Sequence, residues 1–193
     1  MLALGHSASA ETVLLQENFN AENGGDVQTK YTGFAQFNVT VGAVDLIGPG
    51  LADFFPGNGL YVDLDGTSSA AGRLESKSSF ALQTGITYRL QFDLGNSDAQ
   101  FGGGSADNTV TVSLGSAYSE TFNRSGLTPF ETITRLITPI TAVSTELVFQ
   151  EDPIIGGDNL GVLLDNVSLV AVPVPGLLGS FGLAVGGLLL RSR

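Results

Sequence analysis

Apolar and polar residues alternate along much of this chain, and that alternation constrains the fold more than any other feature. In the clearest segment, 87–94, one face carries Tyr88, Leu90, Phe92 and Leu94, and the other carries Arg89, Gln91 and Asp93. Residues 109–114 repeat the pattern. Because successive side chains of a strand point to opposite faces, alternation of this kind predicts half-buried β-strands.

Further short strands are predicted wherever the alternation returns, namely at 12–19, 35–41, 43–47, 60–64, 72–79, 118–123, 130–138, 144–150 and 162–170. Glycine-rich breaks at 24–25, 48–50, 102–104 and 156–157 are typical of loops. No segment before residue 171 has a convincing helical period. The sequence therefore predicts an all-β fold, an antiparallel jelly-roll β-sandwich over residues 11–170.

Composition excludes several classes of function. The net charge is −11, and all nineteen acidic residues lie between Glu11 and Asp165. So acidic a chain is a poor partner for nucleic acid or anionic lipid. There is no Cys, and the only His is His6. Ser-His-Asp and Cys-His nucleophiles and His-ligated zinc are thus excluded, which leaves carboxylates, Tyr, Lys and hydroxyls for any chemistry.

The C-terminal segment has a different character. Pro173-Val174-Pro175 leads into an uncharged Gly- and Leu-rich run, 176–190, followed by Arg191-Ser192-Arg193. As a helix, this run would rise about 22 Å, short of the roughly 30 Å hydrocarbon core of a bilayer. The two arginines would hold its end on the cytoplasmic side. We expect one short membrane helix here; a buried hairpin or a final core helix is the alternative.

Residues 172–193 resemble the PEP-CTERM class of bacterial sorting signals. The resemblance rests on Val172-Pro173-Val174-Pro175, the apolar run and the end with Arg191 and Arg193. It implies recognition by an exosortase, a membrane protease-transpeptidase that removes the tail during export to the cell envelope or extracellular surface. Val174 stands where the family motif has Glu, which leaves open which sorting enzyme acts and whether it cleaves.

The N-terminal segment is consistent with export. Ala8-Ser9-Ala10 has the small-x-small pattern of a signal-peptide cleavage site, and polar Glu11 follows. The preceding apolar stretch is too short for a whole signal peptide and lacks a basic region. We therefore expect residues 1–10 to be the remnant of a signal peptide that starts upstream; a native, disordered N-terminus is the alternative.

Asp165 is the most unusual acidic residue of the chain. Strict alternation along 162–170 places it on the same face as Leu163, Val167 and Leu169. Burying a carboxylate among core side chains destabilises the fold unless a cation or backbone N–H groups interact with it. The segment 17–26 offers oxygen ligands of the kind that calcium prefers, from Glu17, Asn20, Glu22 and Asp26.

The pairing of this first loop with the segment 164–169 is similar to that in galactose-binding-like jelly rolls and carbohydrate-binding modules. The resemblance implies a structural Ca²⁺ between the first loop and the last strand, with Asp165 as the leading ligand. The alternative is that Asp165 accepts backbone hydrogen bonds and the loop acids are solvated.

A second acidic pair, Asp63 and Asp65, alternates with Val62 and Leu64, as on an ordinary half-exposed strand. Paired carboxylates can support glycoside hydrolysis. The favoured interpretation is nevertheless a non-enzymatic exported protein of the envelope or matrix that associates with carbohydrate. A carbohydrate-active enzyme and a purely structural surface protein are the alternatives.

Overall fold

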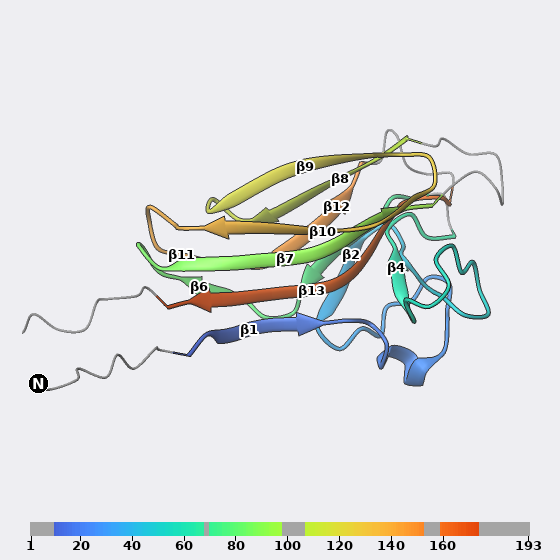
Figure 1. Cartoon of the computed structure of the whole chain (residues 1–193), viewed down its shortest axis with the longest axis horizontal. Helices are drawn as coiled ribbons and strands as arrows, with labels where there is room; N and C mark the ends of the chain where they lie inside the picture. Colours follow the sequence, from blue (N-terminus) through green and yellow to red (C-terminus); the bar gives the residue numbers. More distant parts are fainter. Residues whose placement is uncertain (1–9, 68–69, 98–106, 153–158, 174–193) are drawn as a thin grey trace, which may run out of the picture.

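The computed structural model describes residues 10–67, 70–97, 107–152 and 159–173 (Figure 1). Two antiparallel sheets pack face to face, as the jelly-roll prediction requires. The first sheet, sheet A, contains β10 (Thr128–Ile137), β7 (Thr87–Asn96), β13 (Val162–Val172), β4 (Tyr61–Asp63), β3 (Asp45–Ile47) and β1 (Thr12–Glu17). The second, sheet B, has the order β2 (Phe37–Val41), β5 (Arg73–Ser76), β12 (Leu147–Glu151), β8 (Asp107–Leu114) and β9 (Tyr118–Ser125). A small separate sheet pairs β6 (Phe80–Leu82) with β11 (Val143–Thr145).

Strand β13 organises sheet A. One of its edges pairs with β7. The other edge is shared: β4 pairs with Leu163 and Leu164, and β1 pairs with the stretch from Val167 to Ala171. The junction between these two partners lies at Asp165 and Asn166, where the register with β7 also shifts. Two segments far apart in the sequence, β1 and β4, therefore meet beside the last strand (Figure 1).

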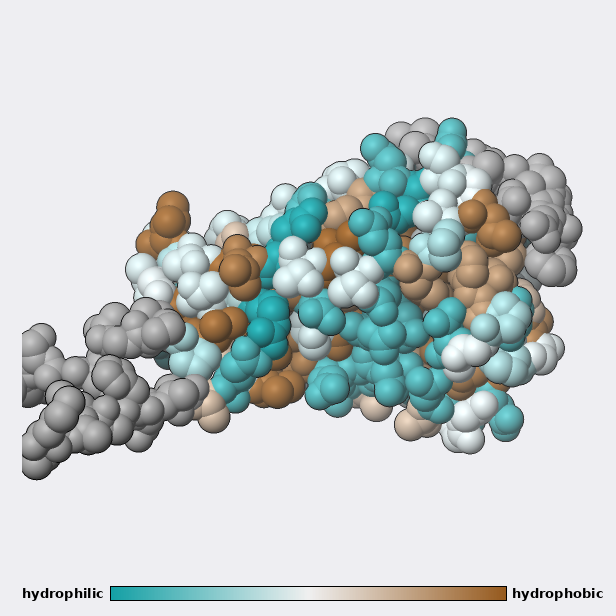
Figure 2. All heavy atoms as spheres, in the orientation of Figure 1, coloured by the Kyte–Doolittle hydropathy of each residue, from teal (hydrophilic) through white to brown (hydrophobic). Residues whose placement is uncertain are grey.

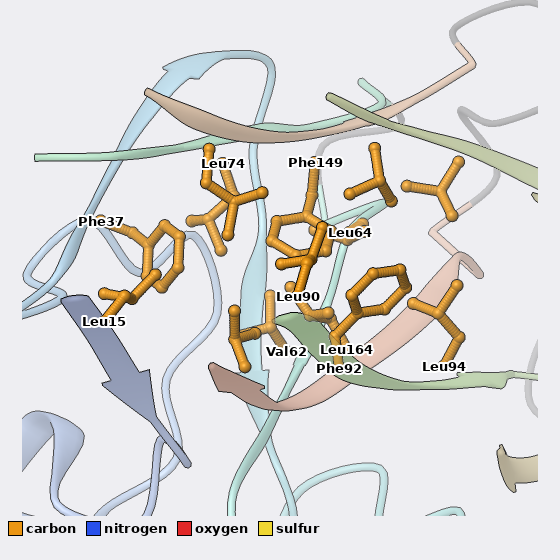
Figure 3. Close-up of a cluster of buried hydrophobic side chains, with 14 of the residues drawn as sticks. Leu15, Phe37, Val62, Leu64, Leu74, Leu90, Phe92, Leu94, Phe149 and Leu164 are labelled. Atoms are coloured by element: carbon orange, nitrogen blue, oxygen red, sulfur yellow. The ribbon is translucent and has the colours of Figure 1, made fainter. Parts of the chain in front are cut away.

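The main core fills the space between the sheets (Figure 3). It is built from the inward positions of the alternating strands, among them Leu90, Phe92 and Leu94 of β7. Phe92 makes edge-to-face contacts with Phe122 and Phe149 of sheet B. These inward side chains lose water contact entirely, and each contributes on the order of 1.5–3 kcal/mol of hydrophobic stabilisation.

A smaller apolar cluster lies on the outer face of sheet A. Ile47, Tyr61 and Leu163 form its buried part. The connection between β3 and β4, residues 48–60, covers them and contributes Leu51, Ala52, Phe54 and Phe55. In the view of Figure 2, hydrophobic atoms gather at the end of the molecule where Figure 1 places this connection. At this end of sheet A both faces are thus covered, the inner face by sheet B and the outer face by this connection.

Most predicted strands are present with shifted ends, and three segments differ. The predicted strand 72–79 ends at Ser76, and a separate strand, β6, follows it. The predicted strand 144–150 is divided into β11 and β12, which pair with different strands. Strand β13 continues to Val172, so Ala171 and Val172 belong to the sheet rather than to the tail. A 3₁₀ turn, η1 (Glu22–Gly25), lies in the first loop.

The expectations for the two ends of the chain fall mostly outside the described residues. Residues 1–9 of the expected leader, including Ala8, and the tail from Val174 through Arg193 lie there; Ala10 and Pro173 are described. Within the described part, no helix is long and apolar enough to cross a bilayer. The membrane helix and the sorting motif therefore remain predictions.

Candidate functional site

A pocket of about 230 Å³ opens on the outer face of sheet A, between the sheet and the connection 48–60. Its lining combines polar and apolar side chains: Thr29, Asp45, Ile47, Leu51, Ala52, Phe54, Asp63, Thr67, Asn159 and Leu160. Asp45, Ile47, Asp63 and Leu160 are buried in the floor, whereas Thr29, Thr67 and Asn159 are exposed at the rim. The pocket therefore has a carboxylate floor, an apolar wall and a rim of hydroxyl and amide groups.

The two carboxylates of the floor come from neighbouring strands. Asp45 of β3 and Asp63 of β4 are directly opposite in the antiparallel register. Their exposed fractions are only 6% and 4%. Like charges directly opposite in a sheet repel each other, so this pair needs compensation from its surroundings.

Asp45 obtains that compensation from donors of the chain itself. Its Oδ1 accepts a 2.7 Å hydrogen bond from the backbone N–H of Lys30. Its Oδ2 accepts hydrogen bonds from the N–H and the hydroxyl of Thr67. Three donors thus fix the Asp45 carboxylate and tie the segments around Lys30 and Thr67 to the edge of the sheet.

Asp63 is held in a different environment. Burial raises the pKa of Asp63 well above its usual range, and the nearby carboxylates of Asp45 and Asp65 raise it further. The N–H groups of Asp65 and Gly161 oppose this shift, the former through a 3.0 Å hydrogen bond to Oδ1. Asp63 is therefore a carboxyl group whose protonated form is favoured, beside a second carboxylate in an open pocket.

Gly161 explains how the acids on this side of the sandwich pack so closely. A Cβ at this position would lie 2.5 Å from Glu151 Oε2 and 2.6 Å from Asp63 Oδ1. It would also lie 2.5 Å from the backbone nitrogen of Asp65. Only glycine fits here without displacing its neighbours. The backbone of residues 159–161 can therefore reach Asp65, whose Oδ2 accepts a 3.0 Å hydrogen bond from the N–H of Asn159.

The aromatic wall is fixed by Tyr61. Its hydroxyl accepts hydrogen bonds from the backbone N–H of Phe54, at 2.7 Å, and of Phe55, at 3.3 Å. Burial raises the pKa of Tyr61 to about 12, so the hydroxyl stays protonated. Phe130 makes edge-to-face contacts with both Tyr61 and Phe55. These contacts hold Phe54 at the pocket, half-buried.

The expectation that Asp63 and Asp65 lie on a half-exposed face is wrong, because both are buried. The covering connection 48–60 and the approach of Asn159 and Leu160 remove them from solvent. Only Asp63 of the two lines the pocket. Its partner there is Asp45, which the sequence analysis missed because the register between β3 and β4 cannot be read from the two segments separately.

The prediction that Asp165 shares a core face with Leu163, Val167 and Leu169 is also wrong. Val162 and Leu164 face the main core, whereas Leu163 faces the outer cluster. Asn166 adopts a positive φ of 49°, and the register shifts between Asp165 and Ser168. This bulge inverts the alternation, so that Val167 and Leu169 return to the core while Asp165 stays outside it.

Asp165 is nevertheless buried where an ionised carboxylate is destabilised. It is only 2% exposed and lies directly opposite Asp93 of β7. Its pKa rises to about 7, chiefly because it is desolvated, with repulsion from Asp93 and Glu17 adding to the effect. Asp165 Oδ1 accepts a 2.7 Å hydrogen bond from the N–H of Asn166, and Asp93 Oδ2 accepts one from the Asn166 side chain.

The five residues proposed as calcium ligands are only partly brought together. Glu17 lies at the end of β1, within electrostatic reach of Asp165 and Glu22. The oxygens of Asn20 and Glu22 are already engaged: Asn20 Oδ1 accepts from Leu60 N–H, and the Glu22 carboxylate from Ala35 N–H and the Tyr31 hydroxyl.

Asp26 is exposed, just after η1. Within the described parts of the chain, no three acidic side chains are arranged to hold a metal ion. Glu17 and Asp165 approach each other at the bulge of β13, with Asp93 as a neighbour that the sequence did not indicate, and Glu17 Oε1 already accepts hydrogen bonds from the N–H groups of Asn18 and Phe19. Calcium remains a prediction.

Comparison with known proteins reveals the fold but no family. No family model and no curated protein matches the chain. A Stig cyclase from Fischerella sp. TAU is similar in structure, with 18% identity over 85% of this chain and 99% of its own, at a TM-score of 0.52. A cleaved adhesin domain of Lys-gingipain from Porphyromonas gingivalis has 15% identity over 83% and 99%, at a TM-score of 0.50.

A family 4 carbohydrate-binding module is also among the similar structures. It has 14% identity over 80% of this chain and 92% of its own, at a TM-score of 0.40. The similarities agree with the jelly-roll-type sandwich seen in the strand order. Because one such fold hosts many activities, function has to be argued from the pocket.

Proposed function

We propose that this chain is an exported, non-enzymatic module that associates with carbohydrate in the cell envelope or extracellular matrix. The pocket on the outer face of sheet A supports the proposal. Sugars present hydroxyl groups at their edges and C–H groups on their faces, and so they need polar and apolar surfaces side by side. The carboxylates of Asp45 and Asp63 and the half-buried ring of Phe54 offer that combination.

Export is proposed from the sequence at the two ends of the chain. The tail, 172–193, supports delivery by an exosortase-like system, and Ala8-Ser9-Ala10 supports passage through a secretory pathway. Replacing Pro173 and Pro175 by Ala in the producing cell should leave the protein at the inner membrane with its tail attached. The mass of the isolated protein would reveal whether the tail is removed; an unchanged location and mass would contradict the sorting proposal.

Carbohydrate association is tested by binding of the full chain to a panel of envelope and matrix polysaccharides. Phe54→Ala should weaken binding at least tenfold, because it removes the aromatic wall. Ile140→Ala is the matched control: it removes an apolar side chain that is 91% exposed and lies outside the pocket. Binding that is equal for the wild type and both variants would contradict a role for the pocket.

A second candidate function is favoured by one observation, the raised pKa of Asp63 beside Asp45. A carboxyl group with a raised pKa can act as the general acid of glycoside hydrolysis, which also uses a second carboxyl group nearby. In an enzyme of this kind, Asp63→Asn would abolish turnover of a bound glycan. A bound glycan that stays intact after prolonged incubation with the wild type would favour the binding module.

A further inference from the structure

The charges around the pocket restrict what it can bind. Among the described residues that line it, only Asp45 and Asp63 are ionisable, and both are acidic. Five of the basic side chains elsewhere already have partners. Arg73, Arg89, Arg124 and Arg135 form ion pairs with glutamates, and Lys77 donates to the carbonyl of Phe34. A ligand that carries a carboxylate or sulfate would meet two carboxyl groups at the floor, and no basic side chain is among the described residues that line the pocket.

The arrangement of Asp45 and Asp63 favours a positive charge. The two carboxylates are opposite each other in the register, both nearly inaccessible to water. The donors to Asp45 are the uncharged N–H groups of Lys30 and Thr67 and the Thr67 hydroxyl. Burial favours the protonated form of Asp63 while no cation is bound; an ammonium group between the two carboxyl groups would favour the ionised form and replace part of the solvation that both have lost.

The rest of the lining distinguishes an organic cation from a metal ion. Calcium needs six to eight oxygen ligands. Here both Asp45 oxygens already accept hydrogen bonds, and half of the lining is apolar: Ile47, Leu51, Ala52, Phe54 and Leu160. An apolar wall contributes nothing to a bare ion, whereas the C–H face of a sugar ring can pack against it. The hydroxyl and amide groups at the rim, Thr29, Thr67 and Asn159, can then meet the ring hydroxyls.

We infer that this pocket binds a sugar unit that carries a free amino group, with Asp63 and Asp45 receiving the ammonium and Phe54 facing the ring. The inference rests on the proposed function and names its ligand class. At about 230 Å³ the pocket is smaller than typical small-molecule sites of roughly 300–1,000 Å³, so it suits one sugar unit. The same unit with an acetylated, uncharged nitrogen should bind less tightly.

The test is calorimetric titration of the full chain with three tetrasaccharides, in EDTA so that metal ions do not contribute. The probes are β-1,4-linked glucosamine, its fully N-acetylated counterpart and a galacturonate tetramer. The glucosamine tetramer should bind at least tenfold more tightly than the acetylated one, and the galacturonate should not bind. The Asp63→Asn variant should bind the glucosamine tetramer with at least tenfold lower affinity, whereas its affinity for the acetylated tetramer should stay almost unchanged.

Glu146→Gln is the charge-matched control, because it removes one negative charge between β11 and β12, outside the pocket. It should bind like the wild type. Equal losses in Glu146→Gln and Asp63→Asn would mean that only net charge attracts the polyamine, which overturns the inference. Binding of neutral glycans without preference for the amine overturns the inference and leaves the proposed function standing. Absence of binding to every glycan, including the wider polysaccharide panel, overturns both.

Discussion

Sheet A contains two pairs of aspartates that face each other across neighbouring strands, Asp45–Asp63 and Asp93–Asp165. Both pairs lie on the outer face of the sheet, yet their surroundings differ. The first is at the floor of an open pocket with an aromatic wall. The second is at the bulge of β13, where Asn166 donates to both partners and Glu17 of β1 approaches. Similar pairs of side chains can thus lie at the floor of an open pocket in one place and at a junction between strands in another.

The largest expected effect is the pH dependence of stability, to which Asp165 and Asp63 should both contribute because burial raises the pKa of each. The pKa of Asp165 is about 7 in the folded protein, against an ordinary value of 3.8. Between these two values the folded state therefore keeps a proton on Asp165 that the unfolded state has released. The stabilisation that protonated Asp165 contributes is complete below about pH 4 and is lost as the pH rises through 7. A shift of this size corresponds to at most about 4 kcal/mol. Asp165→Asn should reduce the slope of the thermal-stability profile between pH 4 and 7, and an unchanged slope would contradict the assignment.

Alanine substitutions in the two pairs should differ by about 3 kcal/mol. Asp45→Ala leaves the N–H groups of Lys30 and Thr67 without their acceptor, at a cost of about 3 kcal/mol. Asp93→Ala loses one hydrogen bond from Asn166 but removes repulsion of Asp165, so its effect should be small. Urea unfolding of the two variants measures the difference. Equal destabilisation would mean that the two pairs are held in the same way.

Gly161→Ala should destabilise the protein by roughly 2 kcal/mol, because the new methyl group must displace Glu151, Asp63 or the backbone at Asp65. The damage should be confined to the pocket side of the sheet. The pKa of Asp165, followed by carboxyl NMR, should therefore stay near 7 in the variant. A large change at Asp165 would show that the two pairs are coupled through β13.

The smallest expected effect concerns calcium. If Glu17 and Asp165 bind Ca²⁺, a concentration ten times the dissociation constant would stabilise the fold by about 1.4 kcal/mol. EDTA should then lower the melting temperature, and Asp165→Ala should abolish that difference. Asp63→Asn is the control, because it alters the other pair and should leave the response to EDTA intact. A melting temperature that is the same with and without EDTA would contradict the calcium prediction.

Local pattern was sufficient to predict most strands. The alternation in 87–94 and 109–114 is strict, and both segments are strands whose inward residues form the core. The pattern failed at Asp165 because a bulge changes the parity of a strand without changing its composition. It failed at 144–150 because one short segment is divided between two strands that belong to different sheets.

The candidate site was predicted less well than the fold. Asp63 was recognised as one of a pair, but with Asp65, its neighbour in sequence, and not with Asp45, its neighbour in the sheet. Phe54 lies in the irregular connection between β3 and β4, and its place at the pocket depends on the hydroxyl of Tyr61. Pairings across strands join residues far apart in sequence, so no local pattern contains them.

The sequence by itself determined the class of fold and the range of possible chemistry. Alternation with a period of two requires strands that are buried on one side, and the lack of Cys and of any His beyond His6 leaves carboxylates, Tyr, Lys and hydroxyls as the groups available for chemistry. The tertiary structure alone decided which acids meet, how far each is buried and which of them line a pocket. The reason is physical: the spacing of side chains along a strand is set by local geometry, whereas desolvation and like-charge repulsion depend on neighbours that only the folded sheet brings together.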